Sequence, residues 1–291
     1  MSCEKGESLS KPRIIMFIAP KREVIENTNR IRRLLEDRGW SILQIVEVGS
    51  KVNHDLVEKC DIVLTLGGDG TILYASRELE GTDVPILGIN FGKIGLLTEL
   101  NPKEFLKSIE LIERKQYRIF GIKRLKAIRS DGKEYPTVLN EYVVMTRSPG
   151  KILGLEIYLD GEHIGDVLCD GLVISTPIGS SSYALSSGGP VVLDTMEAMV
   201  LVPIAPLFRG MYPLVLPSNV SVSVKVRKLW MDAILIADGV IVDSLPRGSS
   251  VSVCYSDYET KFIKLGKRYD RIKRLMGLLS VKKWLMSDET T

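Results

Sequence analysis

The feature that most constrains the fold is a regular alternation of strand and helix patterns up to about residue 115. Short apolar runs predict buried strands at residues 13–19, 41–48, 61–66 and 84–90. A helix pattern follows each strand: the first ends at Gly39, the next two cover about 53–59 and 70–79, and the last starts at Pro102. In the first helix Val24, Thr28, Ile31 and Leu35 share one face. This order predicts an α/β domain with a parallel, Rossmann-like sheet and helices on both faces.

The second half of the chain has a different character. From residue 116 to 266 strand patterns dominate, and Asp-Gly pairs at 131–132, 160–161 and 238–239 predict hairpin turns. The tail returns to helical spacing, with Ile272, Leu275 and Leu279 on one face. We therefore expect an α/β domain over residues 12–115, a β-rich, mostly antiparallel domain over 116–266, and a C-terminal segment, 267–291, that joins the first domain.

Charge and cysteine content exclude several classes of partner. The net charge is only +3 over 291 residues, so neither nucleic acid nor a membrane surface is an expected partner. The four cysteines lie far apart and form no zinc-site spacing, which is typical of reduced thiols. No apolar stretch of the signal-peptide kind occurs at the N-terminus, and we expect a cytoplasmic location.

Several familiar catalytic motifs are absent from the sequence. No GxxxxGK[ST] loop, no GxGxxG fingerprint and no GxSxG elbow occurs, and the chain has only two histidines. These absences argue against a P-loop enzyme, a dehydrogenase of the common dinucleotide-binding type and a serine hydrolase.

The stretch GGDGT, from Gly67 to Thr71, follows a predicted strand and opens a predicted helix. The amides of Gly67, Gly68, Gly70 and Thr71 lie where a helix N-terminus favours phosphate. A carboxylate at this place repels phosphate, so Asp69 needs another role. It can accept a proton or hydrogen bond from a hydroxyl group held close to the phosphate, or face a metal ion. This combination indicates a phosphotransferase site in which Asp69 accepts a proton. The alternative is a tight turn with Asp69 as an ordinary helix cap.

Residues 170–190, DGLVISTPIGSSSYALSSGGP, form a second unusual stretch, rich in hydroxyl groups and glycine. Hydroxyls and amides beside Tyr183 suit a purine, which needs hydrogen bonds at its edge and a cover on its face. The alternative, a tight turn in which Ser180 caps a short helix, is compatible with this interpretation.

Asn140 and Glu141 interrupt an otherwise apolar strand pattern. Because adjacent strand residues point to opposite faces, at least one of the two is expected to meet buried surroundings and to need a partner. A ligand with hydroxyl or amino groups is one such partner, and an edge strand open to water is the alternative.

Together these stretches resemble the NAD kinase family. GGDGT at 67–71, INFGKIGLLTE at 89–99, the Asn140–Glu141 pair and the segment 170–190 occur in that family's order and spacing. PLVLP at 213–217, Asp238–Gly239 and KKWL at 282–285 extend the likeness over most of the chain. The glycine-aspartate motif is also found in lipid kinases and phosphofructokinases, whereas the Ser-Thr-Pro stretch is more specific.

The resemblance implies a transfer of phosphate, assisted by Mg²⁺ or another divalent cation, from ATP or polyphosphate to the 2′-hydroxyl of the adenosine ribose of NAD. In this family's pattern Asp69 deprotonates the hydroxyl, and Gly67, Gly68, Gly70 and Thr71 hold phosphate. The β-rich domain is then the NAD-binding domain, and a homodimer or homotetramer is expected. The residues implied for NAD binding are Asp69, Gly70, Asn140 (adenine), Glu141 (ribose), Asp170 (nicotinamide end), Ser181, Ser182 and Tyr183.

The sequence departs from the family's usual pattern at a few positions. Ile178 stands where the family commonly has threonine or serine, and Ser181 stands where it commonly has threonine. Val240 stands where glutamine is usual. The segment 203–208 lacks the family's histidine. Two other interpretations stay open: a lipid or sugar kinase with the same glycine-aspartate motif, and a non-catalytic or redox protein that binds NAD.

Overall fold

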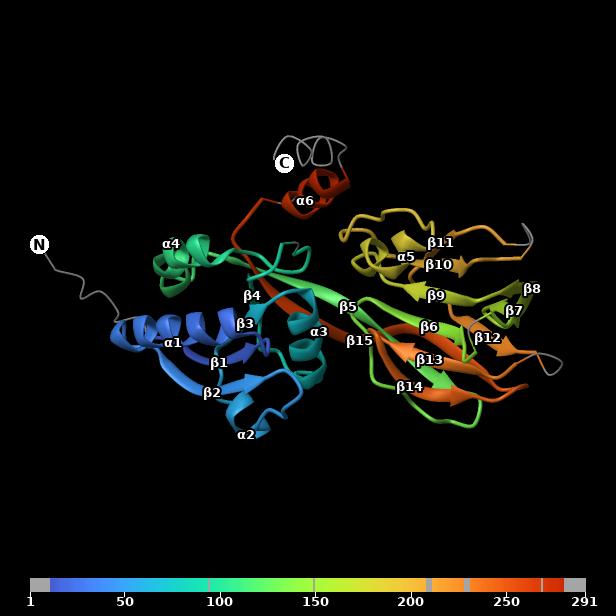
Figure 1. Cartoon of the computed structure of the whole chain (residues 1–291), viewed down its shortest axis with the longest axis horizontal. Coiled ribbons are helices and arrows are strands. Elements are labelled where there is room, and N and C mark those ends of the chain that lie inside the picture. Colours follow the sequence, from blue (N-terminus) through green and yellow to red (C-terminus); the bar gives the residue numbers. More distant parts are fainter. Residues whose placement is uncertain are drawn as a thin grey trace, which may run out of the picture. The chain divides into compact units, whose positions relative to one another are not determined.

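The computed structural model describes residues 11–93, 95–148, 150–207, 211–227, 231–267 and 269–279. The chain divides into two compact units (Figure 1): unit 1 comprises residues 1–121 and 260–291, and unit 2 comprises residues 122–259. The divisions expected from the sequence were after residues 115 and 266. The division points lie within the two long strands β5 (Arg118–Arg129) and β15 (Ser250–Lys264).

Unit 1 is built on a parallel sheet in the order β2-β1-β3-β4, as the alternating pattern predicts. Phe262, near the end of β15, pairs in parallel with Ile86 of β4. The strands of the sheet are β1 (Arg13–Ile18), β2 (Ser41–Glu47), β3 (Ile62–Gly67) and β4 (Ile86–Asn90). The helices of the unit are α1 (Arg22–Asp37), α2 (His54–Val57), α3 (Asp69–Glu78), α4 (Pro102–Glu113) and α6 (Asp270–Leu279).

Helices cover both faces of this sheet because successive strand residues point to opposite sides and nearly all residues of β1 and β3 are buried. Helices α1 and α4 share one hydrophobic cluster with Met16 of β1 and Leu64 of β3. On the other face the ring of Phe17 meets Tyr74 of α3, with 6.2 Å between ring centroids. The predicted apolar face of α1 is confirmed, since Val24, Thr28, Ile31 and Leu35 are its buried residues.

Unit 2 is β-rich and antiparallel, as predicted. One sheet has the order β11-β10-β9-β6-β13-β14, and β15, β12, β7 and β8 pair in sequence in the other. Hydrophobic side chains from strands of both pack into one core cluster. The elements are β6 (Glu141–Thr146), β7 (Leu153–Leu159), β8 (Glu162–Cys169), β9 (Gly171–Ser175), η1 (Gly179–Ser181), α5 (Tyr183–Ser186), β10 (Ala198–Ile204), β11 (Leu214–Pro217), β12 (Val222–Val226), β13 (Ala233–Ala237) and β14 (Val240–Leu245).

Two predicted hairpin turns are confirmed, between β7 and β8 and between β13 and β14. Asp160 and Gly161 have φ of 49° and 86°, and Asp238 and Gly239 have φ of 43° and 82°. Positive φ at both central residues is the geometry of a type I′ turn, one of the two turns favoured in two-residue hairpins, and Asp-Gly is among the sequences that adopt it most readily.

Some predicted bounds differ from those of the structure. Strand β6 begins at Glu141, within the apolar strand pattern around Asn140–Glu141, because the amides of Leu139 and Asn140 bond to a side chain instead of a neighbouring strand. Helix α6 begins at Asp270, and the rest of the predicted tail, including KKWL at 282–285, lies outside the described residues. Within the described part of the chain no helix combines the length and apolar character needed to cross a membrane.

The core of unit 1 yields a direct test through two adjacent leucines of α1. Leu35 is fully buried, whereas Leu34 is 37% exposed. We expect Leu35→Ala to lower the free energy of unfolding by about 2–5 kcal/mol, since it removes buried methyl groups and leaves a cavity. Leu34→Ala should change it by no more than about 0.5 kcal/mol. Urea-induced unfolding followed by circular dichroism measures both, and equal losses would contradict the assigned packing of α1.

Candidate active site

The GGDGT residues lie at the junction of β3 and α3, as expected from the sequence. Gly67 ends β3, Gly68 is the N-cap of α3, and Asp69 is the first helical residue. A Cβ atom on Gly67 would lie 2.1 Å from the Oγ1 atom of Thr71, so a larger residue does not fit there. The close packing of the buried Thr71 against Gly67 fixes the turn that presents Asp69.

The carboxylate of Asp69 binds the loop that follows β4. Its Oδ2 atom accepts a hydrogen bond from the amide of Leu96 at 3.0 Å. Its Oδ1 atom accepts from the amides of Leu97 at 3.0 Å and Thr98 at 3.4 Å. A carboxylate has about four acceptor positions, so three amides leave capacity for one more donor. Asp69 is thus an anchor for residues 96–98 that can still accept a hydrogen bond from a hydroxyl group.

The loop itself is tightly packed beside the GGDGT turn. Asn90 ends β4 and pairs with Gly67, and the amide of Phe91 donates to the Gly67 carbonyl at 2.8 Å. A Cβ atom on Gly95 would lie 2.0 Å from the Oγ1 atom of Thr98 and 2.8 Å from the Asn90 amide group. Gly95, the second glycine of INFGKIGLLTE, is therefore required where the loop packs closely against itself and against the end of β4.

In unit 2, Asn140 and Glu141 are both buried, at 7% and 6% exposure. The edge-strand alternative is therefore wrong. The Oδ1 atom of Asn140 and the Oε2 atom of Glu141 are buried and accept no hydrogen bond from any described residue. Buried acceptors without donors are costly, which makes this pair a candidate for binding a ligand that carries hydroxyl or amino groups.

A second carboxylate holds the backbone of this pair in place. Asp238 accepts hydrogen bonds from the amides of Leu139 and Asn140, both at 2.8 Å, and of Glu141 at 3.1 Å. Burial raises the pKa of Asp238, and the three amides oppose that rise. From the sequence Asp238 was a turn residue and part of the family's pattern, and its contact with this pair was not predicted, because its partners lie about a hundred residues earlier in the chain.

The side chain of Glu141 is itself strongly perturbed. Burial, followed by the charge of Asp238, raises the pKa of Glu141 to about 8, and the hydroxyl of Ser182 acts in the opposite direction. That hydroxyl donates to the Oε1 atom of Glu141 at 3.3 Å. At neutral pH the protonated form of Glu141 is therefore favoured in the absence of a ligand.

The serine-rich stretch joins this pair through its own tight packing. A Cβ atom on Gly179 would lie 2.3 Å from the carbonyl oxygen of Asn140, which explains the glycine at that position. Ser181 lies in η1 and donates to the Ile178 carbonyl at 3.1 Å, and Tyr183 begins α5. The hydroxyl of Ser180 donates to the Pro177 carbonyl at 2.6 Å and accepts from the amide of Val192, just beyond the stretch, at 2.9 Å. The structure thus brings Asn140, Glu141 and Ser182 together.

Asp170 lies elsewhere on the same sheet. Strands β6 and β9 run antiparallel, with Glu141 opposite Ser175 and Met145 opposite Gly171. The carbonyl of Asp170 accepts from the amide of Thr146 at 2.8 Å. Asp170 is therefore at the opposite end of this strand pair from Glu141.

Comparisons with known proteins cover both units. Residues 22–117 match the family model of the ATP-NAD kinase N-terminal domain, and residues 139–265 match that of the C-terminal domain. An NAD kinase of Methanothermobacter thermautotrophicus is 34% identical over 259 residues, which cover 86% of this chain and 90% of the relative. A bifunctional NADP phosphatase/NAD kinase of Methanococcus maripaludis is 33% identical over 87% of this chain, and the match spans only 47% of that longer relative.

A solved structure agrees with these sequence matches. The crystal structure of an NAD kinase from Archaeoglobus fulgidus in complex with ATP has a TM-score of 0.74 and 29% identity to this chain. The match covers 91% of this chain and 97% of that one. The chain therefore belongs to the NAD kinase family.

Proposed function

We propose that the chain transfers the terminal phosphoryl group of ATP to the 2′-hydroxyl of the adenosine ribose of NAD and so forms NADP and ADP. The observation that most directly supports this proposal is the match to both ATP-NAD kinase domain models, whose residues include Asp69 and the pair Asn140–Glu141. The ATP bound to the related Archaeoglobus fulgidus enzyme favours ATP as donor. Polyphosphate stays an alternative donor.

The acceptor is proposed to bind through the buried pair of unit 2. A ribose hydroxyl donates to Glu141, and the adenine amino group donates to Asn140, so that both buried oxygens gain the donors that the described residues do not supply. Ser181, Ser182 and Tyr183 are proposed to contact the adenine, and Asp170 to lie toward the nicotinamide end.

Asp69 is proposed as the base. It takes the proton of the 2′-hydroxyl while the new oxygen–phosphorus bond forms and the bond between the γ-phosphorus and the bridging oxygen of ATP breaks, with ADP as leaving group. Three amides hold the Asp69 carboxylate in place, which supports its use as a positioned acceptor. Gly67, Gly68, Gly70 and Thr71 are proposed to form the phosphate site, with glycine amides as its donors, because the Thr71 amide already donates to the Gly68 carbonyl at 3.0 Å.

A divalent cation is proposed to assist the transfer. Among the described residues no group of three or more His, Cys, Asp or Glu side chains is suited to hold a metal ion. Mg²⁺ commonly binds through one or two carboxylates together with substrate phosphates. A cation held mainly by the ATP phosphates and water fits these residues and would neutralise phosphate charge, which leaves the remaining acceptor position of Asp69 to the sugar hydroxyl.

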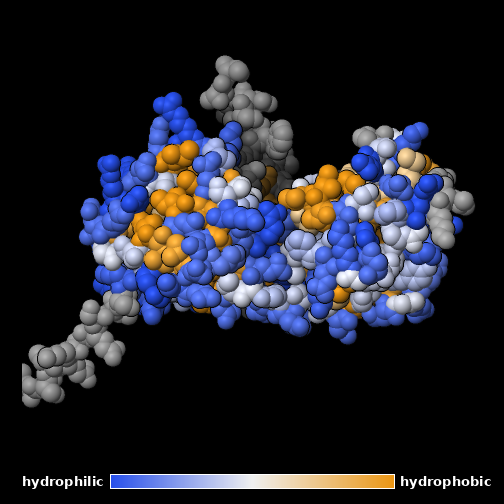
Figure 2. Space-filling view, turned by 90° about the horizontal axis from the view of Figure 1, so that it is seen from below, coloured by the Kyte–Doolittle hydropathy of each residue, from blue (hydrophilic) through white to orange (hydrophobic). Residues whose placement is uncertain are grey.

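We also propose a cytoplasmic homodimer or homotetramer. Hydrophobic side chains gather in patches on the face drawn in Figure 2, and such patches often mark interaction surfaces. At the edge of the six-stranded sheet of unit 2, Val240 and Ile241 are 45% and 63% exposed. Light scattering on the purified protein should give two or four times the chain mass of 32.4 kDa, and a monomer would contradict this proposal.

One assay separates the proposed function from its rivals. The pure protein is incubated with NAD, ATP and Mg²⁺, and NADP is measured with an NADP-specific dehydrogenase. We expect NADP to accumulate. A lipid or sugar kinase would form none, and a non-catalytic NAD-binding protein would bind NAD without consuming ATP.

Replacing the proposed base tests its role. We expect Asp69→Asn to lower turnover by about 10²–10⁴-fold, the usual contribution of a positioned base, while NAD affinity changes little. Asp61→Asn is a matched control, because Asp61 lies just before β3 and pairs with Arg13 at the surface. Steady-state kinetics and NAD titration measure both effects. Turnover of Asp69→Asn within a few-fold of the parent would rule out Asp69 as base.

The raised pKa of Glu141 predicts a pH dependence of NAD binding. The ionised carboxylate is the better acceptor for a ribose hydroxyl, so the dissociation constant for NAD should fall as the pH rises through about 8. Glu141→Gln should bind NAD more weakly and lose this dependence, whereas Glu162→Gln, at an exposed position, should keep it. Calorimetric titration between pH 6.5 and 9 measures the profile, and an unchanged profile in Glu141→Gln refutes the assignment.

A further inference from the structure

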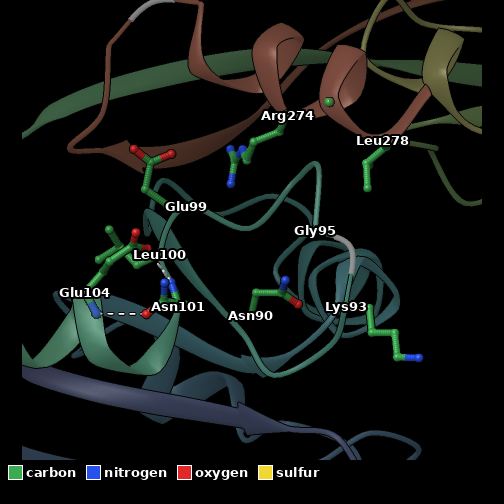
Figure 3. Close-up of a pocket in the computed structure, with 10 residues that line it drawn as sticks. Asn90, Lys93, Gly95, Glu99, Leu100, Asn101, Glu104, Arg274 and Leu278 are labelled. Atoms are coloured by element: carbon green, nitrogen blue, oxygen red, sulfur yellow. Dashed lines mark hydrogen bonds between the residues drawn. The ribbon is translucent and has the colours of Figure 1, made fainter. Parts of the chain in front are cut away.

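A cavity of about 340 Å³ opens within unit 1, at the end of the sheet where β4 finishes. It is lined by the loop after β4, by the start of α4 and by α6 (Figure 3). Its volume is near the lower end of roughly 300–1,000 Å³ that is common for ligand sites. A cavity of this size suits a phosphate chain better than a whole dinucleotide.

The acidic residues of this cavity are already paired with protein donors. Glu99 binds the Lys264 ammonium at 3.0 Å and the amides of Leu265 and Gly266 at 2.8 and 2.7 Å. Burial by itself would raise the pKa of Glu99, but the Lys264 charge and these amides outweigh it and lower the pKa. Glu104 accepts from the amide of Asn101 in the capping box of α4.

The basic residues of the cavity have donors to spare. The Arg274 side chain reaches from α6 into the space between the loop and the helix (Figure 3). One of its nitrogens donates to the Thr98 carbonyl at 2.7 Å, while its buried Nε atom donates to no described residue. Lys93 lies at the rim with its ammonium group turned outward (Figure 3). Because Lys264 neutralises Glu99, the charges of Lys93 and Arg274 are offset only by the Glu104 carboxylate, and one positive charge is left over.

The cavity is coupled to the proposed base through one short segment of chain. The amide of Thr98 donates to Asp69, and the carbonyl of the same residue accepts from Arg274. An anion bound to Arg274 would thus lie beside the loop that Asp69 anchors. An arginine with free nitrogens is also the side chain best suited to recognise phosphate oxygens in fixed geometry.

We propose that this cavity binds the phosphate chain of the phosphoryl donor and that Arg274 is the residue that recognises it. This inference rests on the proposed kinase function. The recognised chemistry is the phosphoanhydride chain, which ATP and inorganic polyphosphate share. Arg274 donates its free nitrogens to phosphate oxygens, and the Thr98 carbonyl fixes the orientation of the guanidinium group.

The test uses tripolyphosphate as the probe and the full chain as the protein. We expect Arg274→Ala to weaken the binding of tripolyphosphate, and to raise the KM for ATP, by about tenfold or more, which corresponds to the loss of a charge-assisted hydrogen bond. NAD affinity should stay within about twofold. Lys273→Ala is the matched control, because it removes the same charge from the next position of α6, where Lys273 is 69% exposed and does not line the cavity.

A second variant covers the case in which Arg274→Ala does not fold. Gly277 also lines the cavity, and a Cβ atom added to it would meet no atom within 4 Å. Gly277→Leu should therefore fill the cavity and keep Arg274 in place. It should weaken the binding of tripolyphosphate and of ATP about as much as Arg274→Ala does. The proposal is overturned if Arg274→Ala and Gly277→Leu bind tripolyphosphate and ATP as well as Lys273→Ala does. It is also overturned if only ATP is affected, or if tripolyphosphate binding is lost while the KM for ATP is unchanged.

The outcome is distinguishable from a failure of the proposed function. If the parent forms no NADP from either ATP or polyphosphate, the kinase assignment fails, and with it the role of the cavity as a donor site. Binding of tripolyphosphate that still depends on Arg274 would then identify an anion site alone. If the parent forms NADP but binds tripolyphosphate independently of Arg274, only the proposed role of the cavity is refuted.

Discussion

The hydrogen bonds between the Asp69 carboxylate and the amides of residues 96–98 are the interaction on which unit 1 depends most. They join the turn after β3 to the loop after β4, whose strands already pair in parallel. Gly67 and Gly95 are needed because their neighbours lie too close for a Cβ atom. The same carboxylate is the proposed base, so the residue that fixes the loop would also meet the substrate.

Unit 2 uses a different physical device at its candidate site. Asp238 binds three consecutive amides and so fixes the backbone of Asn140 and Glu141. Two carboxylates are thereby buried near each other, and two side-chain oxygens have no donor among the described residues. Such an arrangement destabilises the free protein, because buried acceptors need partners. A ligand that donates hydrogen bonds to these oxygens would recover this free energy, so the instability of the free site favours ligand binding.

Local patterns in the sequence predicted much of the fold. The buried face of α1, the start of α4 at Pro102 and the Asp-Gly hairpins follow from periodicity and turn chemistry within a few residues. At least one of Asn140 and Glu141 was expected to be buried, and the GGDGT turn was also recognisable from the sequence. The partners of these residues were not, because Asp238 is 97–99 residues from the amides it binds and Arg274 is 176 residues from Thr98. Contacts of that kind are set by strand order and have no local signal.

The central claim is that the Asp69 carboxylate has acceptor capacity reserved for a sugar hydroxyl. A crystal structure of the full chain with NAD bound tests it most directly. The account predicts the adenosine 2′-oxygen within hydrogen-bonding distance of Asp69, about 2.6–3.2 Å. A well-ordered NAD whose adenosine ribose points away from Asp69, with the carboxylate still bound only to the amides of residues 96–98, would contradict it.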